Sequence, residues 1–210
     1  MSNRALAALL TAVAIVALAA LLAWDVRLAE RWAAEDNIIE WTQVLFFLGA
    51  FALGARRLLG LVRKGRPAAP DLLLVFLFGV LLIGELDLDY RLFGVSVLET
   101  WFFVKPHVWL GYKILAALVI GGAYLAVGIY AFRHREDVWR EARRFTVEPW
   151  GHLFLVGAVI FGIVQLFERQ LNRFPPLPPH FLEESLELVA AIYFFFGMLE
   201  RSRPTREPPG

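Results

Sequence analysis

Residues 5–24 have the sequence ALAALLTAVAIVALAALLAW, which contains no charged side chain. A helix of this length crosses the roughly 30 Å of hydrocarbon in a bilayer, because each helical residue rises about 1.5 Å. The run is also longer than the roughly 7–15 apolar residues of a secretory signal peptide. We therefore expect this stretch to be a retained membrane span rather than a cleaved signal.

The remainder of the chain has the same apolar character. Of its 210 residues, 59% are hydrophobic, and the mean hydropathy is +0.58, which is too apolar for a soluble domain. Further apolar runs predict an all-α membrane bundle of about six helices in a single integral domain, residues 1–210. The expected spans are residues 5–24, 38–62, 71–90, 107–132, 149–168 and 181–199.

Basic residues are concentrated in three parts of the chain. Arginine and lysine are frequent in residues 56–66 and 133–144 and in the tail, 201–206, whereas the alternate connections are acidic or mixed. Basic connections stay in the cytoplasm, so we expect both termini to be cytoplasmic and the basic connections to touch anionic lipid. The net charge of only +1 gives no indication of a nucleic-acid partner.

Two of the expected spans have apolar runs that are too short to cross the membrane. Leu72–Gly84 covers about 20 Å and Leu188–Leu199 about 18 Å, against roughly 30 Å of hydrocarbon. We therefore expect the third helix to continue through Glu85, Asp87 and Asp89, and acidic residues of the last helix to enter the same, outer leaflet.

Charged side chains at membrane depth normally face a bundle interior or an aqueous cavity. Spacings of four residues, as in Asp36 and Glu40 or Glu183 and Glu187, place both carboxylates on one side of a helix. These spacings predict that acids from several helices face one outward-facing cavity. The candidate site residues are Asp36, Glu40, Glu85, Asp87, Asp89, Arg91, Lys113, Glu183, Glu184 and Glu187.

The sequence leaves two interpretations of these acids open. One is a pocket for a divalent metal ion, another cation or a proton, and the other is a structural ion-pair network in which Lys113 is the central base. Carboxylate oxygens favour Ca²⁺, Mg²⁺ or Mn²⁺, and an added histidine would admit Zn²⁺ or Fe²⁺. The candidate metal ligands are Glu40, Glu85, Asp89, His107, Glu183 and Glu187.

Several familiar motifs are absent from the sequence. It contains no Walker loop, no Gly-Xaa-Ser-Xaa-Gly elbow, no His-Glu-Xaa-Xaa-His zinc motif and no histidine pair suited to haem. There is also no cysteine for a thiolate ligand or nucleophile. A divalent metal is thus the one cofactor that the pattern suggests, with no haem, flavin or nucleotide signal.

The segments EDNIIEW (35–41), GELDLDYRLFG (84–94), GYKILAAL (111–118) and LEESLEL (182–188) together resemble uncharacterised bacterial multispanning membrane proteins. That resemblance implies a bacterial inner (plasma) membrane. The first segment is also similar to the acidic part of alkaline ceramidase-like membrane hydrolases. The His-Xaa-Xaa-Xaa-His zinc pair of those enzymes is missing here, and only Glu183 and Glu187 have the comparable spacing.

Three functions fit these observations. The leading one is a cation-binding membrane protein that acts as a metal-dependent lipid hydrolase, in which the metal would polarise an ester or amide of a lipid substrate. The second is a proton- or cation-coupled transporter, whose substrate is an ion. The third is a non-catalytic membrane subunit with a structural charge network. Membrane lipids are the expected partners, and the sequence does not indicate an oligomeric state.

Overall fold

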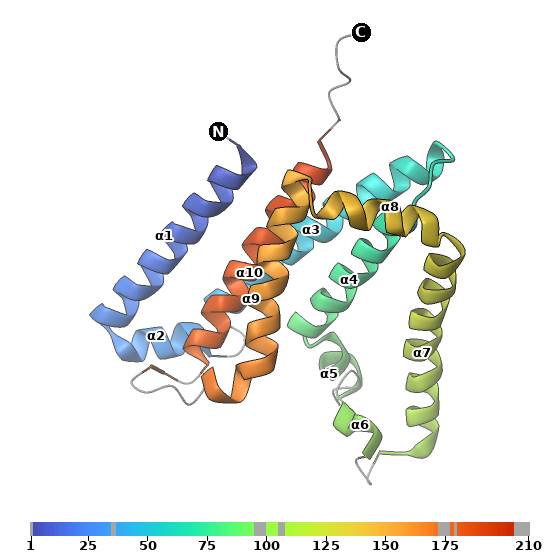
Figure 1. Ribbon diagram of the computed structural model, residues 1–210. Helices are drawn as coiled ribbons and strands as arrows, with labels where there is room; N and C mark the ends of the chain where they lie inside the picture. Colours follow the sequence, from blue (N-terminus) through green and yellow to red (C-terminus); the bar gives the residue numbers. More distant parts are fainter. Residues whose placement is uncertain are drawn as a thin grey trace. The chain divides into compact units, whose positions relative to one another are not determined.

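The computed structural model describes residues 2–34, 37–94, 100–104, 108–171, 177–178 and 180–203. Every regular element in these ranges is an α-helix, in agreement with the all-α prediction. The helices, shown in Figure 1, are α1 (Asn3–Trp24), α2 (Val26–Ala33), α3 (Ile38–Arg63), α4 (Ala69–Glu85), α5 (Leu88–Phe93), α6 (Thr100–Val104), α7 (Leu110–Arg133), α8 (Arg135–Phe145), α9 (Pro149–Leu171) and α10 (Phe181–Arg201).

The chain divides into two compact units. The first contains residues 1–53 and 143–210, and the second contains residues 54–142, so the unit boundaries fall within α3 and α8. The single integral domain expected from the sequence stays a prediction.

Helix α10 lies at the centre of the first unit and buries most of its residues. It runs antiparallel to α9, since the Arg201 guanidinium lies 4.3 Å from the centre of the Trp150 ring while Gln165 bonds to Glu187 at the other end. Glycines permit this close approach: a Cβ atom at Gly157 would lie 3.1 Å from the Phe194 ring. The two helices can be followed side by side in Figure 1.

Helices α1 and α2 and the first part of α3 also belong to this unit. Asp25 separates them, because its carboxylate accepts hydrogen bonds from the backbone N–H groups of Arg27 and Leu28 and so begins a new helix. At the other end of α1, the amide of Asn3 donates to the Glu200 carboxylate, near the end of α10. The start of α1 and the end of α10 therefore lie at the same end of the unit, as Figure 1 also shows. Their location in the cytoplasm stays a prediction.

In the second unit, α4 packs against the end of α3 and against α7. The buried Asp71 carboxylate accepts a hydrogen bond of 2.8 Å from Arg57 Nε, which joins the start of α4 to the end of α3. The rings of Phe76 and Tyr124 meet edge to face, with their centres 5.0 Å apart, between α4 and α7. Gly65, with φ of 61°, allows the tight turn that follows α3.

Four segments in the described part of the chain are long and apolar enough to cross a membrane: Asn3–Trp24, Ile38–Arg63, Leu110–Arg133 and Pro149–Phe167. The chain is therefore a helical protein of membrane type. Helix α4 has only 17 residues, and α10 contains several charged side chains. The count of six spans stays a prediction, although a helix occupies each of the six expected ranges.

The expectation that the third helix continues through Glu85, Asp87 and Asp89 was wrong. Helix α4 ends at Glu85, and Asp87 has a left-handed backbone with φ of 44°, which an α-helix cannot contain. Glu85 and Asp89 therefore belong to different helices and do not share a helix face. Two expected connections, residues 25–37 and 133–148, contain the short helices α2 and α8.

Replacing Gly151 with alanine should destabilise the protein. A Cβ atom at this position would lie 1.8 Å from the backbone oxygen of Phe145, and backbone cannot move aside as a side chain can. We expect a loss of about 1–3 kcal/mol in the free energy of unfolding, measured by thermal denaturation in detergent. The matched control is Gly162→Ala on the same helix, where a Cβ atom meets nothing within 4 Å. Equal stability of the two variants would contradict this packing.

Candidate functional site

The first half of α10 combines three carboxylates with an otherwise apolar helix. Glu187 is 9% exposed, the Glu183 side chain is 13% exposed, and Glu184 is partly buried. Glu184 and Glu187 are three residues apart, so they are neighbours on the surface of α10, about one helical turn apart. Carboxylates this deeply placed need polar partners.

Gln43 of α3 is the partner of Glu184. Its side chain is fully buried, and its Nε2 atom donates to the backbone oxygen of Glu184 at 2.8 Å and to the carboxylate Oε2 at 3.0 Å. An amide nitrogen has two hydrogens, so these contacts use its full donor capacity. The Oε1 atom of Gln43 is buried and has no hydrogen-bond partner in the described part of the chain.

An unpartnered buried amide oxygen is uncommon, because its desolvation costs about 1–3 kcal/mol when no bond replaces the lost water. Two other buried side-chain atoms share this property in the described residues, both of them hydroxyl oxygens, on Thr11 and Ser202. The Gln43 oxygen differs from these two hydroxyl oxygens, because the nitrogen of the same side-chain amide is hydrogen-bonded to a carboxylate.

Further charges surround Glu184. Glu40, one turn before Gln43 on α3, and Glu183 both lie close enough to repel a negative charge on Glu184, whereas His180 attracts it. His180 Nδ1 lies 3.1 Å from Glu183 Oε2 at the exposed start of α10. We call Glu40, Gln43, Glu183 and Glu184 the α3–α10 oxygen cluster.

Glu187 lies on the other flank of α10, against α9. Its Oε1 atom accepts a hydrogen bond of 3.1 Å from Gln165 Nε2. Each buried acid of α10 is thus bonded to a glutamine amide of a neighbouring helix. A neutral amide stabilises a carboxylate by hydrogen bonding without cancelling its charge.

The α3–α10 oxygen cluster is rich in hydrogen-bond acceptors. Carboxylate and amide oxygens are ligands of hard cations, and a carboxylate can instead take up a proton. Among the residues that the structure describes, no three histidine, aspartate or glutamate side chains are grouped as metal ligands. The metal site expected from the sequence stays a prediction.

The candidate residues from the sequence fall into three groups. Those brought together in the first unit are Glu40, Glu183 and Glu184, with Glu187 on the adjoining flank of α10. Those that belong to the second unit are Glu85, Asp87, Arg91 and Lys113, the last lying one turn inside α7. Those outside the described residues are Asp36, His107 and the side chain of Asp89. Convergence of the first two groups stays a prediction.

Gln43 and Gln165 were not among the candidate residues, which were chosen for their charge or as histidine ligands. A buried amide also needs a partner in an apolar environment. A signal was present, because Gln43 follows Glu40 by three residues in a helix that is otherwise apolar over the next three turns. Uncharged polar residues within apolar helices are therefore the sequence signal that indicates both contacts.

Comparisons with known proteins give one weak similarity. The chain is 28% identical over 144 residues to a protein described as "CAAX prenyl protease 1 homolog" from Oryza sativa subsp. japonica. The match covers 58% of this chain and 29% of that protein, so the chain spans less than a third of its relative. No protein-family model matches the chain, and no solved structure matches it. The similarity to alkaline ceramidase-like hydrolases is thus not confirmed.

Replacing Gln43 with leucine should destabilise the contact between α3 and α10. Leucine has a similar volume but no donor, so Glu184 would lose the hydrogen bonds to its backbone oxygen and its carboxylate. We expect a loss of about 1–3 kcal/mol, seen as a lower thermal unfolding midpoint in detergent. Thr42→Val, which removes an exposed hydroxyl bonded within its own helix, is the control. A Gln43→Leu variant as stable as this control would show that the contact contributes nothing.

Proposed function

We propose that this chain is an integral membrane protein that binds a cation, or a proton in its place, at the α3–α10 oxygen cluster. The observation that carries this proposal is the buried Gln43 amide, which donates both hydrogens to Glu184 while its own oxygen has no hydrogen-bond partner among the described residues. A cation or a bound proton would give that oxygen a partner.

The charge balance of the cluster supports the same function. Three carboxylates, on Glu40, Glu183 and Glu184, lie near one another, and His180 Nδ1 lies 3.1 Å from Glu183 Oε2. Mutual repulsion is relieved when one carboxylate is protonated or when a cation binds between them.

The test measures thermal unfolding of the purified protein in detergent, with Na⁺, Ca²⁺, Mg²⁺ or Mn²⁺ added separately and across a range of pH. A ligand that binds only the folded state raises its stability, by about 2.7 kcal/mol at one hundred times Kd. We expect at least one cation, or acidification, to raise the unfolding midpoint of the unmodified protein.

Glu184→Gln should abolish this gain, because the amide retains the shape of the side chain but can neither ionise nor take up a proton. The exposed Glu30 of α2 provides a charge-matched control, Glu30→Gln, which should keep the gain. The proposal fails if the unmodified protein and the Glu184→Gln variant respond alike to every cation and to pH.

Membrane hydrolysis is the second candidate function, and the similarity to the CAAX prenyl protease homolog favours it. In this case the cation held by the cluster would polarise the scissile carbonyl or lower the pKa of a bound water. The cluster would then need an open coordination position. The lipid ester or amide expected from the sequence and a prenylated peptide are the two substrate classes to compare.

Hydrolysis is tested by incubating the purified protein with a prenylated CAAX peptide or with a lipid amide, each with the cation identified above. We expect the Glu184→Gln variant to lose product formation, measured by mass spectrometry, while Glu30→Gln retains it. If the unmodified protein releases no product from either substrate, cation binding serves transport or structure instead.

A further inference from the structure

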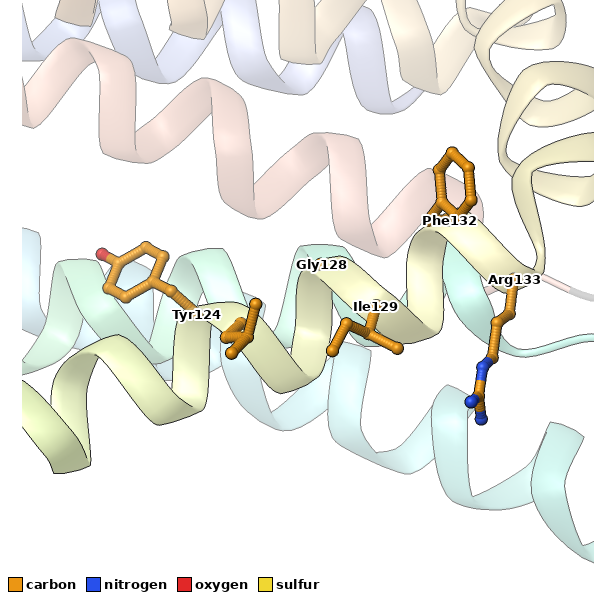
Figure 2. A pocket seen from close by; sticks show the side chains of 6 residues that line it. Tyr124, Gly128, Ile129, Phe132 and Arg133 are labelled. Carbon is orange, nitrogen blue, oxygen red and sulfur yellow. The ribbon is translucent and has the colours of Figure 1, made fainter.

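The second half of α7 has a hollow on its surface, shown in Figure 2, with a volume of about 670 Å³. Two rows of side chains at four-residue spacing form it: Tyr124, Gly128 and Phe132 in one row, and Leu125, Ile129 and Arg133 in the other. Gly128 leaves a gap between the two aromatic rings, because a Cβ atom at this position would meet nothing within 4 Å.

The hollow is open and almost wholly apolar until it reaches Arg133. Leu125 is 64% exposed and Phe132 is 70% exposed, and α7 as a whole buries no residue. Figure 2 shows Ile129 and Arg133 on the same side of the helix, with Arg133 at the end of the row. An open apolar surface is the environment that an acyl chain requires.

Positive charge is concentrated at one end of the hollow. Arg133 lines it directly, and the guanidinium of Arg135 lies 5.4 Å from the centre of the Phe132 ring. The three acids of α8 do not neutralise Arg133 and Arg135, because α8 also contains three further arginines. These acids are Glu136, Asp137 and Glu141, and the arginines are Arg140, Arg143 and Arg144. Asp137 pairs with Arg140. The two guanidinium groups at the hollow are therefore a local surplus.

We propose that this hollow is a binding site for a phospholipid with an anionic headgroup. The acyl chain lies over Gly128, between the Tyr124 and Phe132 rings, and the phosphate accepts hydrogen bonds from Arg133 and Arg135. Guanidinium groups bind phosphate oxygens in a bidentate geometry, and each basic residue near an anionic lipid surface contributes about fivefold in affinity. This site is separate from the α3–α10 oxygen cluster and does not depend on the function proposed for it.

The test titrates the purified, delipidated protein in detergent with palmitoyl-oleoyl phosphatidylglycerol and follows lipid-bound species by native mass spectrometry. Phosphatidylcholine with the same acyl chains and inorganic phosphate serve as the comparison ligands. We expect phosphatidylglycerol to bind at least about fivefold more tightly than phosphatidylcholine, and inorganic phosphate not to displace it.

Gly128→Phe places a ring in the gap, at a position where a Cβ atom meets nothing within 4 Å, and should weaken binding of both lipids about tenfold. Val119→Phe is the control, because Val119 is 63% exposed and lies nine residues, or two and a half turns, from Gly128, on the opposite side of α7. Arg133→Gln should weaken phosphatidylglycerol about fivefold and leave phosphatidylcholine unchanged.

Two results would overturn the lipid site. One is equal affinity of the Gly128→Phe and Val119→Phe variants for phosphatidylglycerol, with both variants folded by circular dichroism. The other is equal affinity of the unmodified protein for phosphatidylglycerol and phosphatidylcholine. Neither result would bear on cation binding at Glu184, which is measured with different ligands and variants.

Discussion

The hydrogen bonds from the buried Gln43 amide to Glu184 are the interaction on which the candidate site depends. They fix the contact between the first half of α3 and the first half of α10. In hydrophobic surroundings a polar side chain is stable only when it has a partner, so the two residues hold each other in place. Glutamine is neutral and does not cancel a negative charge on Glu184, and this makes the contact different from a salt bridge.

The sequence was sufficient to predict the helices, because length and hydropathy are local properties. The apolar run in residues 5–24 corresponds to α1, and the runs in 38–62 and 149–168 correspond to α3 and α9. The short helices were not predicted. Helix α8 is strongly amphipathic and is interspersed with arginines, so its composition resembled a basic connection rather than a span.

The break after Glu85 shows where reasoning from length failed. A short apolar run suggested that α4 had to continue to cover the hydrocarbon, but a helix can also stop short when the backbone changes direction. The left-handed conformation of Asp87 makes that change, and aspartate is among the few residues other than glycine that adopt it readily. The acids after the break consequently occupy a separate short helix, α5, rather than one continuous face.

The two ends of the first unit show how a structural polar cluster differs from a candidate site. At the end where α1 begins, Asn3 bridges Glu200 and Arg203, and Arg4 Nη2 lies 3.0 Å from His152 Nδ1. Since arginine can only donate, Nδ1 must accept, and the Nε2–H of the neutral imidazole then donates to the Thr146 carbonyl.

Each donor named in that cluster has an acceptor, and each acceptor has a donor. The Glu200 carboxylate also forms a salt bridge with Arg203, with 3.2 Å between Oε2 and Nη1. At the opposite end, carboxylates are paired with neutral amides, and one amide oxygen lacks a hydrogen-bond partner in the described residues. The named groups of the first arrangement satisfy one another and have the properties of a structural tie between α1, α9 and α10, although the buried Ser202 hydroxyl at the same end also lacks a partner in the described residues. The second places an amide oxygen that has no hydrogen-bond partner in the described residues beside the Glu184 carboxyl group, and that combination is the physical reason for assigning ligand binding to the α3–α10 oxygen cluster.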